Sequence, residues 1–464
     1  MHELVIRDAS VVTPAGRLRG DLAVDGGAIA SIGEGLPPGR AEVRAGGRWL
    51  VPGAVDSPCH IAQAPVAGEP PCPHDWETAT RAAVAGGTTT VIPQSMAARG
   101  ADVAAALDAY LAGAPGQALA DYAVQLQMLA ADPAFLTGGL PRLAARGVRA
   151  VKMFSTYPGY ALGDAEILAI LDAAARAGVI GILHAEDDAL VRHATSAELA
   201  AGRTGIGRQT FARPQAAEAT LIHRAVAYGR ANGARLHVFH VSGALALAEI
   251  ARARAQGLPL TAETCAHFLA FTAADLDRPD FEGAKFLCAP PLRSEGDHAA
   301  LWAAPADGGP DIVSSDHSPS HRMPAILRAR AGASMTFADF GGGFPGLQMM
   351  APTVLSLRVA TGRLSPERFA EVTATAPARL FGLTRKGRLQ VGCDADFCLW
   401  DPAAAWTVRH QDMESRVDFA PWDGMAMTGR PVLTAVRGRI VMRDGRIDSS
   451  ARGHGALIAM EAPG

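Results

Sequence analysis

The middle of the chain alternates short apolar runs rich in β-branched residues with alanine-rich stretches typical of helices. The expected strands include residues 88–92, 150–154, 181–184, 236–241 and 311–315, and the expected helices include 164–176 and 216–232. Continuous apolar strands separated by helices are typical of a parallel sheet that is covered on both faces. Over such a length, a (β/α)8 barrel is the economical way to close the sheet. We therefore expect an α/β fold built on a TIM-like barrel.

Both ends of the chain differ from this middle, because they contain short strands separated by turn residues. Asp25-Gly26-Gly27 and Asp444-Gly445 lie between apolar runs, which is the sequence signature of β-hairpins. We expect the two ends to pair into one small β-sandwich domain formed by residues 1–51 and 384–464. Residues 52–383 would then form the barrel.

The composition argues against several classes of function. Lys plus Arg number 43 and Asp plus Glu number 46, and a formal net charge of −3 argues against binding to nucleic acid or to an anionic membrane surface. With 49% hydrophobic residues, the chain can bury a large core. Its six cysteines are too sparse for a disulfide framework. We find no signal-peptide pattern and no apolar run of about 18 residues, so we expect a cytoplasmic protein.

Polar side chains recur where the expected barrel strands end, which is where barrel active sites lie. These residues are His60, Lys152, His184, His240 and Asp316, each from a different strand. A single histidine in such a place usually serves packing or hydrogen bonding, but five residues in one repeated position are hard to attribute to chance. Imidazole and carboxylate ligands around an open position fit a hydrolytic Zn²⁺ site.

Lys152 lies within an apolar strand, where an unpaired ammonium group would be costly. Burial favours the neutral amine, which is nucleophilic. A neutral amine can take up CO2 and become an anionic carbamate with two oxygens that could bind two metal ions. The alternative is a lysine paired with a carboxylate such as Asp316, and Lys152 considered alone favours this simpler interpretation.

The ordered motifs of the chain resemble the cyclic-amide branch of the amidohydrolase superfamily, which contains dihydropyrimidinases, hydantoinases, allantoinases and dihydroorotases. Each motif is weak alone, but the ordered set is specific for the fold and the superfamily. The resemblance extends over nearly the whole chain, and its motifs are Val51-Pro52-Gly53-Ala54-Val55-Asp56, Val151-Lys152-Met153-Phe154, His184-Ala185-Glu186, His240-Val241-Ser242, Glu263-Thr264-Cys265-Ala266-His267, Pro290-Pro291-Leu292-Arg293, Ser315-Asp316-His317-Ser318-Pro319, Gly342-Gly343-Phe344-Pro345-Gly346 and residues 386–396.

The resemblance implies a metal-dependent hydrolase that opens the C–N bond of a small cyclic amide or imide. It implies one zinc site formed by carboxylated Lys152, His184 and His240. A second site would be formed by His60, the same carboxylated lysine and Asp316. Relatives of this kind are usually homo-oligomers, so the resemblance also implies a dimer or a tetramer.

The same resemblance assigns roles around the substrate ring. A metal-activated hydroxide would attack the ring carbonyl, and Asp316 would take its proton and pass it to the leaving nitrogen. Tyr157 would donate a hydrogen bond to the developing oxyanion. The substrate-binding positions are Tyr157, Ala289 and Gly341. Ala289 stands where a serine is usual, and the loop around Gly341 lacks a common asparagine; both changes argue against a standard hydantoin or dihydropyrimidine substrate.

One position departs from the family pattern at the second zinc site. The usual His-x-His motif reads Pro58-Cys59-His60 here, and proline cannot bind a metal. Because side chains alternate along a strand, we expect Pro58 and His60 to share the inward face and Cys59 to point away. Three alternatives follow: a one-metal enzyme, a two-metal enzyme with one weak site, or a non-catalytic relative that acts as an oligomeric scaffold. The other four strand-end residues are present, which favours a retained metal and retained activity.

Three further residues are weaker candidates. Arg322 and Arg328 follow the aspartate motif and could bind an acidic substituent, although surface arginines are the simpler interpretation. His237 lies three residues before His240, and alternation along the strand predicts that it points out of the barrel as a structural residue.

Overall fold

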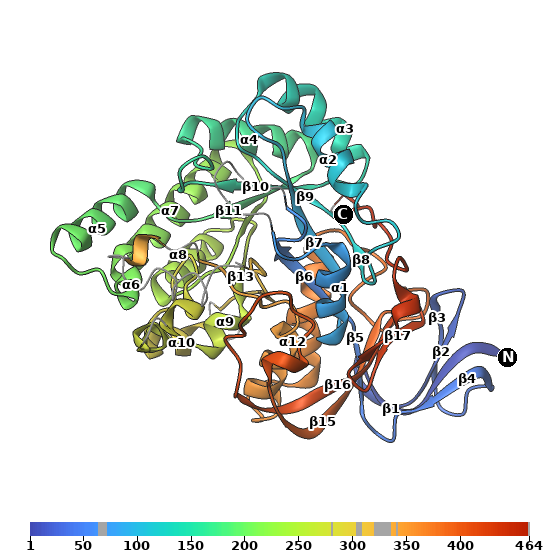
Figure 1. The fold of residues 1–464 in the computed structure, drawn as a ribbon. Helices are drawn as coiled ribbons and strands as arrows, with labels where there is room; N and C mark the ends of the chain where they lie inside the picture. Colours follow the sequence, from blue (N-terminus) through green and yellow to red (C-terminus); the bar gives the residue numbers. More distant parts are fainter. Residues whose placement is uncertain (64–71, 280–281, 303–308, 320–335, 340–341, 463–464) are drawn as a thin grey trace.

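The computed structural model of the chain describes residues 1–63, 72–279, 282–302, 309–319, 336–339 and 342–462 (Figure 1). Its parallel sheet has the strand order β14-β13-β12-β11-β10-β9-β7-β6, with β8 paired to β7. The two end strands meet, since Ser315 N–H, just after β14, donates to Asp56 of β6 over 2.8 Å. The strands of this nearly closed barrel are β6 (Ala54–Cys59), β7 (Thr88–Met96), β8 (Asp121–Tyr122), β9 (Gln125–Gln127), β10 (Ala150–Phe154), β11 (Ile180–His184), β12 (Leu236–Val238), β13 (Leu260–Cys265) and β14 (Ile312–Ser314).

Helices connect the barrel strands and cover them. Helix α4 shows why they form: Ile167, Ile170, Leu171 and Ala174 recur at helical spacing and are buried against the barrel, and the helix stops at Gly178, whose φ is 63°. The α-helices are α1 (Trp76–Ala85), α2 (Val103–Leu111), α3 (Leu140–Ala145), α4 (Asp164–Ala177), α5 (Asp188–Ala200), α6 (Gln209–Ala212), α7 (Gln215–Asn232), α8 (Ala244–Ala255), α9 (Ala266–Ala270), α10 (Glu295–Leu301), α12 (Met350–Val354), α13 (Pro366–Ala370) and α14 (Ala376–Leu380).

The second sheet combines strands from both ends of the chain, in the order β18-β17-β16-β15-β5-β1-β2-β3, with β4 paired to β1. It lies below and to the right of the barrel in Figure 1 and has a core of its own. The fold class predicted from the sequence is therefore confirmed. The strands are β1 (His2–Thr13), β2 (Gly16–Asp25), β3 (Ala28–Gly33), β4 (Gly39–Arg44), β5 (Trp49–Pro52), β15 (Phe397–Thr407), β16 (Ala426–Val436), β17 (Arg439–Arg443) and β18 (Arg446–Ile447).

Both hairpins predicted in the chain ends are present. Strands β2 and β3 are antiparallel around Gly26 and Gly27, and β17 and β18 are antiparallel around Asp444 and Gly445. The φ angles of Asp444 and Gly445 are 49° and 76°, as a type I′ turn requires. The domain boundaries at residues 51/52 and 383/384 stay predictions.

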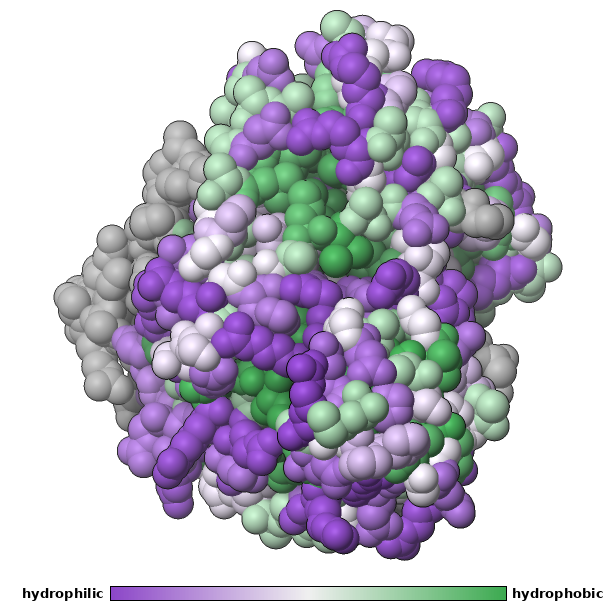
Figure 2. Space-filling model, turned by 90° about the vertical axis from the view of Figure 1, so that its right-hand side faces the viewer, coloured by the Kyte–Doolittle hydropathy of each residue, from purple (hydrophilic) through white to green (hydrophobic). Residues whose placement is uncertain are grey.

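Hydrophobic side chains lie mainly in the interior. One cluster fills the space between barrel and helices, and a smaller one, with Ile182, Phe239 and Phe381, fills the inside of the barrel. On the face drawn in Figure 2, hydrophilic residues predominate, and hydrophobic residues gather most clearly in a hollow in the upper half of the view. Among the described residues, no helix combines the length and the apolar character needed to cross a bilayer.

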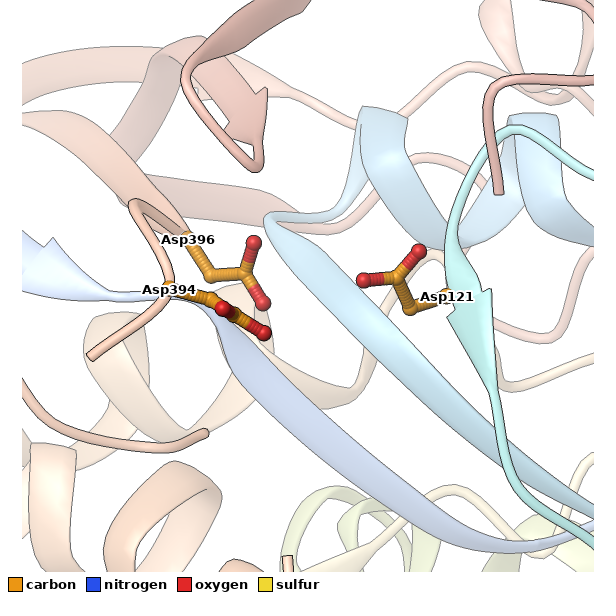
Figure 3. Close-up of side chains that lie close together, drawn as sticks. All are labelled: Asp121, Asp394 and Asp396. Atoms are coloured by element: carbon orange, nitrogen blue, oxygen red, sulfur yellow. The ribbon is translucent and has the colours of Figure 1, made fainter. Parts of the chain in front are cut away.

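Three buried carboxylates lie close together between the barrel and the second sheet (Figure 3). They are Asp121 of β8 and, just before β15, Asp394 and Asp396. Lys386 Nζ lies 2.5 Å from Asp121 Oδ2, 2.9 Å from Asp394 Oδ2 and 2.6 Å from Asp396 Oδ2. The ammonium group of Lys386 occupies the place that a metal ion would need. The cluster is therefore an internal ion-pair network that joins the two parts of the fold.

Replacing Lys386 by methionine is expected to destabilise the protein by about 3–5 kcal/mol, because three buried carboxylates lose their main counter-charge. The matched control is Arg385→Met, which removes an exposed arginine paired with Asp394 of the same cluster. An exposed pair of this kind contributes about 0–1 kcal/mol. Thermal and urea unfolding compare the two variants, and equal destabilisation would contradict the central role of Lys386.

Candidate active site

Lys152 lies in the middle of β10, with its side chain inside the barrel and only 1% exposed. Its Nζ atom lies 3.9 Å from the centre of the Phe239 ring and 4.9 Å from that of Phe154. Burial among these apolar groups lowers the pKa of Lys152 to about 7, although the charges of Asp316 and Glu263 act in the opposite direction. A large fraction of the amine is therefore neutral near neutral pH and can act as a nucleophile.

His184 and His240 face each other at the ends of β11 and β12. His184 Nδ1 and His240 Nε2 lie 2.9 Å apart, and both rings are buried. Two nitrogens bound to one tetrahedral zinc ion lie about 3.3 Å apart, because each Zn–N bond is about 2.0 Å long. The pair therefore fits two adjacent positions around one divalent cation. Burial lowers the pKa of His184 to about 4, so its ring is neutral and can bind a metal.

Glu186 and Arg213 fix the orientation of His184. Its Nε2 lies 2.7 Å from Glu186 Oε2, and Glu186 forms a two-point ion pair with Arg213. Burial alone would raise the pKa of Glu186, but the charge of Arg213 and the hydrogen bond from His184 hold it well below its usual value. The ionised carboxylate accepts the Nε2 proton and leaves the Nδ1 lone pair directed toward His240, as in many metal sites.

Replacing Glu186 by glutamine is expected to weaken zinc binding about 10–100-fold, because the variant keeps the side-chain volume but loses the charge that fixes the tautomer of His184. Competition with a coloured chelator measures this affinity. The matched control is Glu198→Gln on α5, which removes another carboxylate held by two arginines, Arg203 and Arg208. Unchanged zinc affinity in Glu186→Gln would contradict the role of this carboxylate.

His60 and Asp316 lie across the mouth of the barrel, with His60 Nε2 4.0 Å from Asp316 Oδ1. The other ring nitrogen of His60, Nδ1, lies 2.6 Å from Gln63 Oε1, and Gln63 Nε2 donates to Gln127 Oε1 over 3.0 Å. Burial raises the pKa of Asp316 to about 7, while the charge of Lys152 acts against this rise. Asp316 can therefore exchange a proton near neutral pH.

Cys59 points away from this site, as the alternation along the strand predicts. Its side chain is buried in a cluster that contains Trp76 and Ala79 of α1 on the outside of the barrel. Burial also raises the pKa of the Cys59 thiol well above its usual value, so the metal-binding thiolate is disfavoured. Cys59 therefore does not replace the missing donor at position 58.

Tyr157 follows β10 and stands beside the two histidines. The centre of its ring lies 5.1 Å from that of His184, and Arg213 Cζ lies 4.8 Å from the centre of the same ring. Burial raises the pKa of Tyr157, so its hydroxyl group stays protonated and can donate a hydrogen bond. Its φ of 80° is unusual for a residue with a side chain, and such positions are often found at functional sites.

The other predicted substrate positions lie in two adjoining segments. Ala289 is half-buried. The described part of the late loop lies against the segment just before it, since Gly343 N–H donates to Leu287 O over 2.8 Å. Three predicted positions lie outside the described residues: Gly341, Arg322 and Arg328.

The expectation that His237 points out of the barrel is wrong. His237 of β12 is in register with Ile182 of β11, and Ile182 is in register with Lys152. Residues in lateral register share one face of a parallel sheet, so His237 lies inside the barrel with Lys152. Counting back from His240 fails because β12 ends at residue 238 and His240 has a φ of 42°. The expected structural role fits the ring, which lies 3.1 Å from Glu263 Oε2 inside the barrel.

The sequence reasoning missed several of these residues. Glu186 belongs to the motif His184-Ala185-Glu186, but no role was predicted for it, although its place two residues after His184 could have suggested one. No sequence pattern indicated a role for Arg213, because it follows α6 and is 27 residues away from its partner Glu186. Nothing in the sequence indicated Gln63 and Gln127 either, because the contact between Gln63, four residues after β6, and Gln127, at the end of β9, depends on the closed barrel.

The parallel barrel, the sheet from both chain ends and the polar residues at the barrel mouth define a TIM-barrel protein with a candidate active site at its usual place. Residues 49–441 match the amidohydrolase family. The D-hydantoinase of Ralstonia pickettii is 33% identical over 446 residues, 96% of each chain. The D-hydantoinase of Streptomyces coelicolor is 32% identical over 97% of each chain. The crystal structure of dihydropyrimidinase from Brevibacillus agri superposes with a TM-score of 0.93 at 30% identity, covering 100% of this chain and 99% of that one.

The chain belongs to the amidohydrolase family, and the resemblance seen in its ordered motifs is confirmed. The family match covers the barrel and, in the second sheet, β5, β15, β16 and part of β17, while the alignment with the Ralstonia pickettii D-hydantoinase covers 96% of the chain.

Proposed function

We propose that the protein is a metal-dependent hydrolase that opens the C–N bond of a small cyclic amide or imide. The observation that carries this proposal is the pair formed by His184 Nδ1 and His240 Nε2, 2.9 Å apart at the barrel mouth beside a buried lysine. The similarity over nearly the full length to D-hydantoinases and a dihydropyrimidinase supports the cyclic amide as the substrate class.

The residues that would hold the cation are Lys152, His184 and His240, and Zn²⁺ suits this set of ligands. In this proposal the neutral amine of Lys152 attacks the carbon of CO2, one C=O π bond becomes a C–O⁻ bond, and the nitrogen releases one proton to water, which gives an anionic carbamate with two oxygen donors. When bound, a divalent cation supplies a water of lowered pKa and polarises the carbonyl group to be attacked. The apolar surroundings of Lys152 and its low pKa support the carbamate, because both favour the reactive neutral amine.

The remaining steps belong to residues of the chain. Asp316 takes a proton from the water that attacks the ring carbonyl and returns it to the leaving ring nitrogen, as a base and then as an acid. Its pKa of about 7, raised by burial, suits both directions of transfer. Tyr157 donates its hydroxyl hydrogen to the oxygen on which negative charge develops. Arg213 packs against the Tyr157 ring and pairs with Glu186, so it holds Tyr157 and, through Glu186, His184 in place.

The rate of zinc uptake by metal-free protein is expected to depend on pH and on CO2. Burial lowers the pKa of Lys152 to about 7, so the reactive neutral amine predominates above this pH and disappears below it. At a fixed CO2 pressure, uptake should therefore rise about tenfold between about pH 6 and about pH 8. Zinc uptake in CO2-free buffer is the control. A rate that does not respond to CO2 at any pH would contradict the carbamate.

A panel of ring substrates tests the proposed function: hydantoins, dihydropyrimidines, dihydroorotate, allantoin and cyclic imides. We expect zinc-loaded protein to open at least one of these rings, with the open-chain acid detected by mass spectrometry.

Absence of turnover across the panel, with zinc bound, would favour a second candidate function. That candidate is a non-catalytic scaffold, and Pro58 and Ala289 favour it because neither side chain provides a polar contact. Its assembly into dimers or tetramers, measured by light scattering, remains a prediction for either function.

A further inference from the structure

We propose that the site holds one divalent cation per chain, on the side of Lys152, His184 and His240, and that His60 and Asp316 stay free of metal. This inference rests on the proposed function and specifies the number and place of its cations. His60 and Asp316 would then serve the substrate directly, as hydrogen-bonding and proton-transferring groups.

The distance between the donor atoms differs between the two sides of the site, and only one of these distances suits a tetrahedral cation. His184 Nδ1 and His240 Nε2 are 2.9 Å apart, whereas His60 Nε2 and Asp316 Oδ1 are 4.0 Å apart. A zinc ion with bonds of about 2.1 Å to both members of the wider pair would need an angle of about 145° between them, far from the tetrahedral value. The narrower pair fits a tetrahedral ion without a large movement.

In the part of the chain that the structure describes, no third His, Cys, Asp or Glu side chain converges with His60 and Asp316. Position 58 is a proline, and Cys59 is packed against α1 outside the barrel. Among the described residues, Asp121, Asp394 and Asp396 form the one group of three His, Cys, Asp or Glu side chains whose ligand atoms converge within 4.8 Å. The ammonium group of Lys386 lies among these three carboxylates, and Arg437 and Arg385 also pair with the group, so it does not provide a second cation site.

An amide network fixes the tautomer of His60 in the same way as Glu186 fixes that of His184, so the spacing of the donor atoms, and not the tautomer, distinguishes the two sides of the site. Gln63 Nε2 donates to Gln127 Oε1, so Gln63 Oε1 is directed at His60 Nδ1 and accepts its proton. This fixes the tautomer and leaves the Nε2 lone pair facing Asp316 across 4.0 Å. The gap is too wide for a direct hydrogen bond but suits a bridging N–H group or water. In this proposal the gap between His60 and Asp316 takes a substrate N–H group or a water molecule.

Metal analysis of protein loaded with excess zinc and bicarbonate and then desalted tests this inference. We expect one zinc per chain in the wild type, one in His60→Ala and none in His184→Ala, so the two histidine variants are matched. Two zinc ions per chain in the wild type would overturn the inference and leave the proposed function intact. One ion that is lost in His60→Ala but kept in His184→Ala would overturn it as well. No zinc in the wild type would overturn the proposed function itself.

A measurement on the unmodified protein covers the case in which a histidine variant fails to fold. In crystals of the zinc-loaded wild type, anomalous scattering at the zinc edge should give one peak per chain, next to His184 and His240. A second peak of similar height between His60 and Asp316 would overturn the inference. Loading with Mn²⁺ gives an independent readout, since a single ion gives the spectrum of an isolated spin and two adjacent ions give a coupled one.

Discussion

Replacing Lys152 by alanine is expected to remove bound zinc and to lower kcat/KM at least about 1,000-fold, because metal activation supplies several kcal/mol of transition-state stabilisation. The variant cannot form the carbamate, and the two histidines left at the site provide too few ligands. Metal content and turnover are measured on the same preparation. A variant that keeps both its zinc and its turnover would show that Lys152 is not a ligand.

Two comparisons separate this effect from a loss of stability. Lys285→Ala removes a partly exposed lysine that is paired with Glu282, and we expect it to keep full zinc content and activity. Formate or acetate should partly restore zinc binding to Lys152→Ala, because a small carboxylate fits the space left by the side chain and provides the missing anionic oxygens. An absence of rescue, together with a lowered melting temperature, would indicate a folding role instead.

Replacing Asp316 by asparagine is expected to lower kcat by about 100- to 10,000-fold, the usual contribution of a general acid–base group. The zinc content should stay at one ion per chain, because we infer that Asp316 is not a ligand. The substitution keeps the shape of the side chain and removes its negative charge and its ability to take up a proton. Steady-state kinetics on the best ring substrate, with zinc analysis of the same sample, measures both quantities.

The control for this variant is Asp311→Asn, just before the same strand, where the carboxylate pairs with Arg254 far from the barrel mouth. We expect its kcat to equal that of the wild type. If Asp316→Asn retains wild-type kcat, another group carries the proton. If it loses zinc together with activity, Asp316 is a ligand after all, and the single-cation inference fails with it.

The architecture was predictable because local sequence patterns determine it. Apolar runs such as residues 150–154 become buried parallel strands whichever neighbours they have, and the expected helix at 164–176 becomes α4 at Asp164–Ala177. The tight turn at Asp444 and Gly445 requires positive φ angles, which an Asp-Gly pair can adopt, so the hairpin could be predicted from these two residues. These features depend on short-range chemistry.

The site was predictable only in part. The rule that barrel sites lie at strand ends predicted His184, His240 and Asp316 as site residues without knowledge of their distances, whereas Lys152, also predicted at a strand end, lies in the middle of β10. It could not give the orientation of His237, because the backbone turns sharply at His240 and strand alternation stops there. Contacts between segments far apart in the chain, such as Arg213 with Glu186, depend on the closed fold.

The ion-pair network around Lys386 has a practical consequence. The contact between the two parts of the molecule depends on the ammonium group of Lys386, which belongs to the chain and cannot be removed by a chelator. Treatment with EDTA should therefore abolish activity while the melting curve stays that of a folded protein. Metal-free protein could then be stored and reconstituted with other divalent ions, and the activities of the different metal forms could be compared.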